Sequence, residues 1–312
     1  MSRVALISIL GLIILSEHVH AQTFSYAYFN QQDSTYYSSL LILPQKDSIK
    51  GLVVRDYTSL PDTTTWKPNG FAQKCLHSGY AYLITNSSNY FPELCYSDTV
   101  LHRIDTMVHH ALSAHSTPKQ NVFVGGISAS GTRAFKYAGF CEKGMSHFDI
   151  KIAGIFGVDP PLDLVRFYQS VHHSDSFMAG MAEEAVLKDR VFEEKMGNPK
   201  DDWIKYYETS VFTHQHFTGG NAHDYLRIPI ILFHEPDLDW WWQERGARYS
   251  DINSIDIDRF YDYLTDLGKS NMEVVATSEK GYDKHGNRKC HSWSIVDEEY
   301  LIEWILKHSQ FD

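Results

Sequence analysis

The sequence has 312 residues, of which 43% are hydrophobic and 14% aromatic. This length and composition allow one large domain or two ordinary ones with a sizeable hydrophobic core. The formal net charge of −11 argues against nucleic acid as a partner, because a phosphate backbone is bound by a basic surface.

The first residues are typical of a secretory signal. One positive charge at Arg3 precedes an apolar run over residues 4–15, and small side chains follow at Val19 and Ala21. This order predicts cleavage after Ala21, which makes residues 1–21 a signal peptide and 22–312 the mature chain. An uncleaved membrane anchor is the alternative, but the apolar run is short for a membrane span. We expect a secreted or periplasmic protein without a stable membrane anchor.

Short apolar segments alternate with amphipathic ones along the mature chain. The alternation at its start predicts two antiparallel strands, over residues 24–30 and 35–44. Later strands and helices should then form a mostly parallel sheet with helices on both faces. The strands are expected at 50–57, 78–89, 121–126, 151–159, 228–237 and 271–281, and the main helices at 98–115, 129–137, 255–268 and 294–309.

Residues from about 160 to 225 interrupt this alternation. They contain several helical patterns rich in aromatic residues and methionine, without a strand between them. We therefore predict a single α/β domain over residues 22–312 that carries an inserted helical cap at about 160–225.

The segment Gly125–Gly131, GGISASG, stands where a predicted strand turns into a helix. Glycines allow neighbouring backbone to approach closely at such a turn. A serine at its apex, Ser128, is exposed at the carboxyl ends of the strands. The next backbone N–H, that of Ala129, lies at a helix start and is free to stabilise an oxyanion. These are the requirements of an activated nucleophile.

This segment resembles the nucleophile elbow of the α/β-hydrolase superfamily, G-x-S-x-G, except that Ser130 stands in place of the final glycine. A phosphate-binding turn is the competing interpretation, but the segment lacks the lysine of a P-loop and the spacing of GxGxxG. The resemblance implies an α/β-hydrolase fold and the chain order serine, acid, histidine.

The acid is expected at the end of the strand predicted over 228–237 or just after it. Asp237 fits the spacing of the superfamily best, followed by Asp239 and then Glu235, although each could instead cap the next helix. Asp159 ends the preceding strand at the same edge of the sheet. It is an alternative acid or a supporting residue, but an aspartate before Pro160-Pro161 is more typical of a turn.

The histidine should follow the last strand and precede the last helix. His291 lies there, directly before that helix, while His285 lies in a KHGN turn. We therefore assign His291 as the general base; the alternative is a capping or packing histidine beside Trp293. A second oxyanion donor is expected from backbone near Tyr57, where the sequence lacks the HG or HGGG of lipase-like families.

The tryptophan run that follows the expected acid predicts an aromatic pocket formed by Trp240 and Trp241. The resemblance implies a serine hydrolase that cleaves carboxylic esters of small molecules, without a metal or an organic cofactor. A secreted peptidase of the same fold is the runner-up. A relative that has lost catalysis and binds a glycan or an apolar ligand is the alternative of another class.

Four cysteines allow three disulfide pairings, of which Cys75–Cys95 is favoured because the two residues flank one strand and its following loop. No CxxC or HExxH motif is present, and adjacent histidines at 172–173 cannot chelate one ion together on a helix.

Overall fold

The computed structural model describes residues 22–46, 48–89, 97–115, 117–172 and 174–310. The expected signal peptide and Cys95 lie outside these residues. Cys75, Cys141 and Cys290 are free thiols among the described residues, and the favoured Cys75–Cys95 pairing involves Cys95, which lies outside them. Among the described residues, no helix is both long enough and apolar enough to cross a membrane.

An eight-stranded sheet runs through the molecule in the order β1-β2-β4-β3-β5-β6-β7-β8. The first two strands form an antiparallel hairpin, β2 is antiparallel to β4, and all later pairs are parallel. The predicted mostly parallel sheet is therefore confirmed. The strands are β1 Phe24–Tyr28, β2 Ser38–Ile42, β3 Gly51–Tyr57, β4 Tyr80–Asn86, β5 Val122–Ile127, β6 Ile152–Val158, β7 Ile230–His234 and β8 Met272–Ala276.

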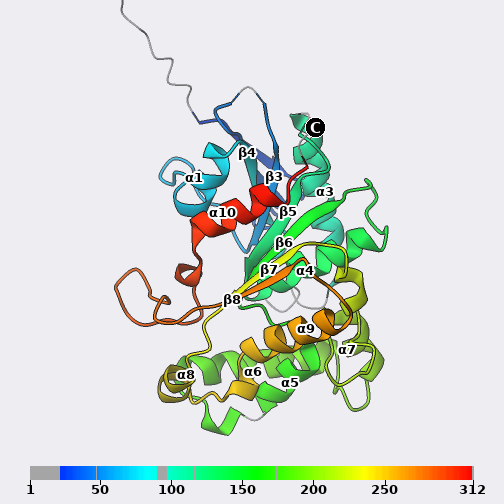
Figure 1. Cartoon of the computed structure of the whole chain (residues 1–312), viewed down its shortest axis with the longest axis vertical. Coiled ribbons are helices and arrows are strands. Elements are labelled where there is room, and N and C mark those ends of the chain that lie inside the picture. Colours follow the sequence, from blue (N-terminus) through cyan, green and yellow to red (C-terminus); the bar gives the residue numbers. More distant parts are fainter. Residues whose placement is uncertain (1–21, 47, 90–96, 116, 173, 311–312) are drawn as a thin grey trace, which may run out of the picture.

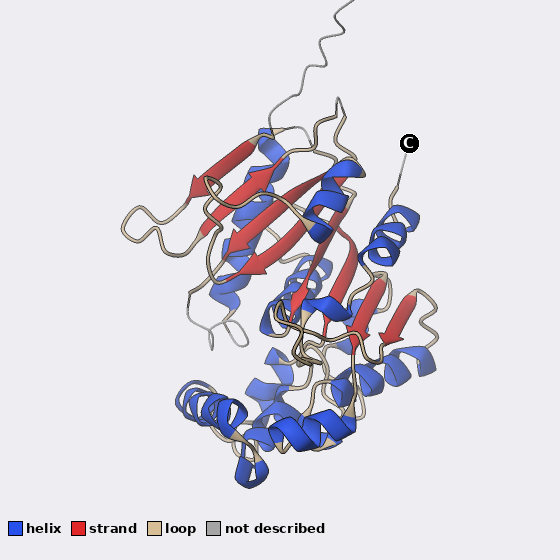
Figure 2. Ribbon diagram, turned by 90° about the vertical axis from the view of Figure 1, so that its left-hand side faces the viewer, coloured by secondary structure: helices blue, strands red, loops and turns tan. Residues whose placement is uncertain are grey.

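Helices cover both faces of the sheet (Figures 1 and 2). One face packs against α1 (Gly70–His77) and α10 (Glu298–Lys307), and the other against α3 (Asp98–Ala114), α4 (Ala129–Glu142) and α9 (Ser254–Asp266). The last helix begins four residues later than predicted, because Asp297 accepts hydrogen bonds from the backbone N–H groups of residues 299 and 300 and so caps it.

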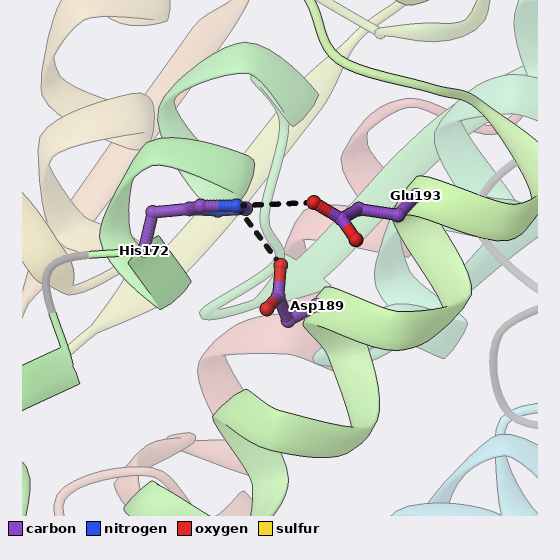
Figure 3. Close-up of side chains that lie close together, drawn as sticks. All are labelled: His172, Asp189 and Glu193. Atoms are coloured by element: carbon purple, nitrogen blue, oxygen red, sulfur yellow. Dashed lines mark ion pairs between the residues drawn. The ribbon is translucent and has the colours of Figure 1, made fainter.

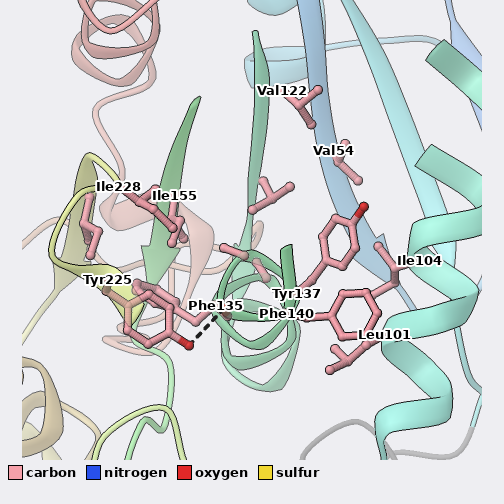
Figure 4. Close-up of a cluster of buried hydrophobic side chains, with 14 of the residues drawn as sticks. Val54, Leu101, Ile104, Val122, Phe135, Tyr137, Phe140, Ile155, Tyr225 and Ile228 are labelled. Atoms are coloured by element: carbon pink, nitrogen blue, oxygen red, sulfur yellow. Dashed lines mark hydrogen bonds between the residues drawn. The ribbon is translucent and has the colours of Figure 1, made fainter. Parts of the chain in front are cut away.

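Successive side chains of the inner strands point to opposite faces of the sheet and pack in two separate hydrophobic cores. On β3, Leu52 and Val54 join the core beneath α3 and α4, while Val53 joins the core beneath α1 and α10. A strand that is buried on both faces has a continuous run of apolar residues, and residues 52–54, LVV, form such a run. Figure 4 shows the first core, in which the Tyr225 hydroxyl donates to the Phe135 carbonyl at 3.1 Å.

A group of helices lies at the carboxyl ends of the parallel strands (Figure 1). Helices α5 (Leu164–His172), α6 (Ala179–Lys195) and α7 (Trp203–Thr209) come between β6 and β7, and α8 (Leu238–Arg245) follows β7. The strand predicted over 228–237 ends at His234, since the chain turns at Pro236 and Asp237 caps α8. Short 3-10 helices occur at Ser174–Ser176, Ala222–Tyr225, Tyr249–Asp251 and Trp293–Ile295.

Candidate active site

Ser128 stands at the turn between β5 and α4 in a backbone conformation that side chains rarely adopt, with φ 54° and ψ −133°. Two backbone hydrogen bonds fix this turn: the N–H of Ser128 donates to the carbonyl of Val158 on β6 at 2.9 Å, and its carbonyl accepts from the N–H of Thr132 at 3.1 Å. The half-buried Ser128 side chain lines a cavity at the carboxyl edge of the sheet.

Small residues on either side of Ser128 let the strand and the helix meet. A Cβ on Gly126 would lie 2.4 Å from the Ser130 Oγ, and one on Gly131 would lie 3.0 Å from the Gly126 carbonyl oxygen. Ser130, which departs from the family pattern, closes the turn with its own hydroxyl. Its Oγ donates to the Ile127 carbonyl at 2.8 Å and accepts from the Ile127 N–H at 3.0 Å. The hydroxyl of Ser130 is therefore used within the turn.

His291 meets a carboxylate other than the expected one. Its Nδ1 lies 2.5 Å from Oδ2 of Asp159, the residue that follows β6. Because a carboxylate only accepts hydrogen bonds, Nδ1 carries the proton and Nε2 is left as an acceptor. The Asp159 side chain is 4% exposed and that of His291 is 32% exposed. The buried Asp159 carboxylate therefore orients the His291 ring and fixes its tautomer.

The prediction that Asp237 holds His291 is wrong. Asp237 caps α8 by accepting from the N–H of Trp240 at 3.0 Å, and Arg288 Nη2 lies 2.9 Å from its Oδ2. This carboxylate serves the helix start and the loop before His291. Asp237 therefore has the helix-capping role that was the alternative expectation for this residue.

The other two candidate acids after β7 also lie apart from His291. Glu235 is buried and pairs with Arg288, and it accepts from the N–H of Gly281 at 3.0 Å and the hydroxyl of Thr277 at 2.9 Å. Glu235 therefore holds the loop after β8. Asp239 is exposed in the first turn of α8.

A buried polar network holds the backbone of Asp159. The Asn253 side-chain amide donates to the Asp159 carbonyl at 2.9 Å, and Asn253 in turn accepts from Arg166 at 3.0 Å. Arg166 Nε donates to Asp256 at 2.7 Å, and Asp256 accepts from the N–H of Leu162 at 3.0 Å. The segment just after β6 is thus fixed by groups on α5 and α9.

The two expected oxyanion donors lie at the ends of neighbouring strands, one at the last residue of a strand and the other at the start of the following helix. Ala129 is the first residue of α4, and Tyr57 is the last residue of β3, which pairs with β5 through Arg55 and Gly125. The guanidinium of Arg55 lies 4.9 Å from the centroid of the Tyr57 ring. Tyr57 does not line the cavity that contains Ser128, whereas Ala129 packs in the core of the helical group beside it.

The cavity has a volume of about 330 Å³ and contains both Ser128 and His291. Trp240 and Trp241 line it, as expected from the sequence, while Trp242 is 51% exposed. Helices α5 and α6 and the segments before α6 and α9 supply the remaining apolar wall. Most of that wall consists of Phe167, Val171, Phe177, Met181, Ala185 and Ile252. The pocket therefore suits a substrate with an apolar body.

Two clusters in the described part of the chain offer metal-ligand atoms. His172 Nε2 of α5 lies 3.0 Å from Asp189 and 3.8 Å from Glu193 of α6 (Figure 3), in an ion-pair cluster that contributes no residue to the cavity. The second cluster, Glu235, Asp237 and Cys290, already contains the guanidinium of Arg288 between its carboxylates. Neither cluster includes the serine or the histidine that lines the cavity.

Comparison with known proteins supports the fold. No protein-family model matches the sequence, and a search of curated proteins finds no match. Among solved structures, acylaminoacyl peptidase from Pyrococcus horikoshii superposes with a TM-score of 0.61 at 13% identity, over 94% of this chain and 44% of that one. A carboxylesterase from Lactobacillus plantarum gives 0.55 at 10% identity, over 94% of this chain and all of that one (100%). The protein has an α/β-hydrolase fold, and these structural neighbours are esterases and peptidases.

Proposed function

We propose that this protein is a serine hydrolase in which Ser128, His291 and Asp159 act together on carboxylic esters. The observation that carries the proposal is the 2.5 Å contact between His291 Nδ1 and Asp159, with Ser128 and His291 lining one cavity. Asp159 replaces Asp237 in the assignment of the acid. The strained backbone of Ser128 at the strand-to-helix turn supports its role as the nucleophile.

In the proposed reaction, Ser128 Oγ attacks the ester carbonyl while His291 Nε2 takes its proton. The N–H of Ala129, at the start of α4, stabilises the oxyanion together with a backbone donor near Tyr57. Asp159 stabilises the imidazolium, which then returns the proton to the departing alcohol. Water attacks the acyl-serine by the same route and releases the carboxylic acid.

An ester is the first choice of substrate, and a peptide bond is the second. The structural neighbours include both a carboxylesterase and a peptidase, and this chain spans less than half of the peptidase. We propose further that the protein acts outside the cytoplasm once residues 1–21 have been removed, as the N-terminal pattern predicts.

Labelling of the purified mature chain with a fluorophosphonate tests the proposal, beside Ser128→Ala and with a 4-nitrophenyl acetate assay on both proteins. We expect labelling and turnover in the wild type and neither in Ser128→Ala. Ser170→Ala is the matched control, because it removes another hydroxyl that lines the same cavity and should still be labelled. Absence of labelling in a folded wild-type protein would overturn the proposal in favour of a binding protein.

A further inference from the structure

The cavity that contains Ser128 also contains two cationic side chains, Arg245 and Lys289. They bring positive charge to a cavity of a chain whose formal net charge is −11. Arg245 is the last residue of α8 and is half-buried, whereas Lys289 lies two residues before His291.

The backbone around Arg245 is held firmly. The N–H of Met178 donates to the Arg245 carbonyl at 3.0 Å, and the Ser176 hydroxyl donates to the Gly246 carbonyl at 2.8 Å. Gly246 has φ 66°, and a Cβ there would lie 1.7 Å from the Ser176 carbonyl oxygen. The end of α8 is therefore docked on the segment that leads into α6.

The guanidinium of Arg245 is positioned on two sides. Its central carbon lies 5.4 Å from the centroid of the Trp240 ring. Its Nη1 would lie 3.4 Å from a Cβ built on Gly180, which also lines the cavity. A guanidinium that is packed in this way loses little further freedom when it binds a ligand.

Among the described residues, no carboxylate lies within ion-pair distance of the Arg245 guanidinium, whereas Arg133, Arg166 and Arg288 each have a carboxylate partner. Two carboxylates also line the cavity. Asp251 accepts from the backbone N–H of residue 248 at 2.9 Å, and Glu184 is exposed and already has a partner of its own. The positive charge of Arg245 is thus available to a ligand.

We propose that the substrate carries a carboxylate that Arg245 binds, attached to an apolar body that packs against Trp240 and Trp241. The planar fork of an arginine matches a carboxylate with two parallel hydrogen bonds. Lys289, which also lines the cavity, adds attraction for the same charge. The inference deepens the proposed function and rests on it, because the carboxylate site and Ser128 share one cavity.

Turnover of matched esters tests the charge preference from both sides of the scissile bond. The acyl side is probed with 4-nitrophenyl hydrogen glutarate against 4-nitrophenyl valerate. The leaving-group side is probed with 3-(4-acetoxyphenyl)propanoate against its primary amide. We expect kcat/KM to favour the anionic ester in at least one pair, by about 10- to 100-fold, as one charge-assisted contact provides.

Substitution of Arg245 should remove this preference. In Arg245→Gln the ratio of kcat/KM values within the preferred pair should fall to near one, and Arg245→Lys should retain part of it. Arg248→Gln is the matched control. The central guanidinium carbon of Arg248 lies 6.0 Å from the centroid of the ring of Trp242, the neighbouring tryptophan, and Arg248 does not line the cavity. A wild-type ratio near one in both pairs would overturn the inference.

A binding measurement separates this inference from the proposed function. In Ser128→Ala, calorimetry should show that 3-phenylpropanoate binds at least about 10-fold more tightly than 3-phenylpropanamide, and that adding Arg245→Gln abolishes the difference. If this holds while no ester is turned over, the carboxylate site stands and the proposed hydrolase fails. If fluorophosphonate labelling succeeds but the two ligands bind equally, the hydrolase stands and the carboxylate site fails.

Discussion

At the level of single residues, the carboxylate that meets His291 is selected by the other partners of each candidate rather than by its position in the sequence. Asp159 and Asp237 both follow a parallel strand at the same edge of the sheet. Arg288 and the N–H of Trp240 engage Asp237, while Asp159 is left to His291. The cationic partner of Asp237 lies 51 residues further along the chain, in the loop before His291.

The first prediction compares these two carboxylates. Asp159→Asn should lower kcat by on the order of 10⁴-fold, because an amide no longer stabilises the imidazolium or its tautomer. Asp237→Asn should keep kcat within about tenfold of wild type and lower the free energy of unfolding by about 1 kcal/mol or less, because it removes the partly exposed ion pair with Arg288 while an asparagine still caps the helix. Ester turnover and urea unfolding of both variants decide between them. A larger loss of kcat in Asp237→Asn would restore the original assignment.

The second prediction concerns His234, a 2%-exposed residue at the end of β7. Burial lowers the pKa of His234 from 6.5, against the opposing charges of Asp258 and Asp159. Between the folded and unfolded pKa values the unfolded chain binds more protons, so the free energy of unfolding should fall as the pH drops below about 6.5.

Urea midpoints at pH 7.5 and pH 5.0 measure this decline, with His234→Gln as the comparison. The variant should start less stable and lose less stability on acidification. An equal decline in both proteins would assign the effect to other groups.

At the scale of elements, the turn between β5 and α4 combines a strained Ser128 with tightly packed small neighbours. A backbone conformation of this kind costs on the order of 1–3 kcal/mol and persists because surrounding contacts hold it. Here the two hydrogen bonds of the Ser130 hydroxyl and the bond from Ser128 to Val158 supply those contacts. A serine can therefore replace the usual glycine of this turn.

The third prediction tests close packing at the turn. Gly126→Ala should abolish fluorophosphonate labelling, because its Cβ would lie 2.4 Å from the Ser130 Oγ and 2.7 Å from the Ser130 carbonyl carbon. Gly268→Ala is the control: that glycine has φ 88° with no atom within 4 Å of a Cβ, so its cost is conformational, about 1 kcal/mol. Full labelling of Gly126→Ala would show that the turn can shift to admit a methyl group.

At the scale of the whole molecule, one buried ion pair joins the helical group to the sheet. The side chains of Arg166 on α5 and Asp256 on α9 are 4% and 1% exposed. Through Asn253 the same network reaches the carbonyl of Asp159. The helical group and Asp159 are thus positioned by one set of contacts.

The fourth prediction follows from this network. Arg166→Met should lower the free energy of unfolding by about 3–5 kcal/mol, because it leaves the Asp256 carboxylate buried without its partner. Adding Asp256→Asn should recover part of the loss, since the amide carries no charge. Urea unfolding of the two variants tests this, with circular dichroism to confirm folding. A double variant less stable than Arg166→Met would show that the charge of Asp256 is needed for its bonds to the backbone.

The architecture of the sheet and its helices could be predicted from the sequence. Apolar strands alternate with helical segments, and GGISASG marks a strand-to-helix turn with both a serine and close-packing residues. These signals are local, because side-chain period, capping and steric fit act within a few residues. For the same reason the positions of Trp240 and Trp241 in the cavity could be anticipated from the run that follows β7. The roles of Ser128 and of the N–H groups at Ala129 and Tyr57 remain predictions.

The carboxylate that meets His291 could be identified only from the folded chain. Asp159, Glu235, Asp237 and Asp239 share the same local signal, an acid after a buried strand, so no periodicity separates them. The selection depends on Arg288 and on contacts between strands that are distant in sequence. The presence of the Arg245 charge in the cavity could likewise not be predicted from the sequence, because the end of α8 reaches the cavity only by docking on the segment before α6. Long-range pairing of charges is not encoded in any short stretch of the chain.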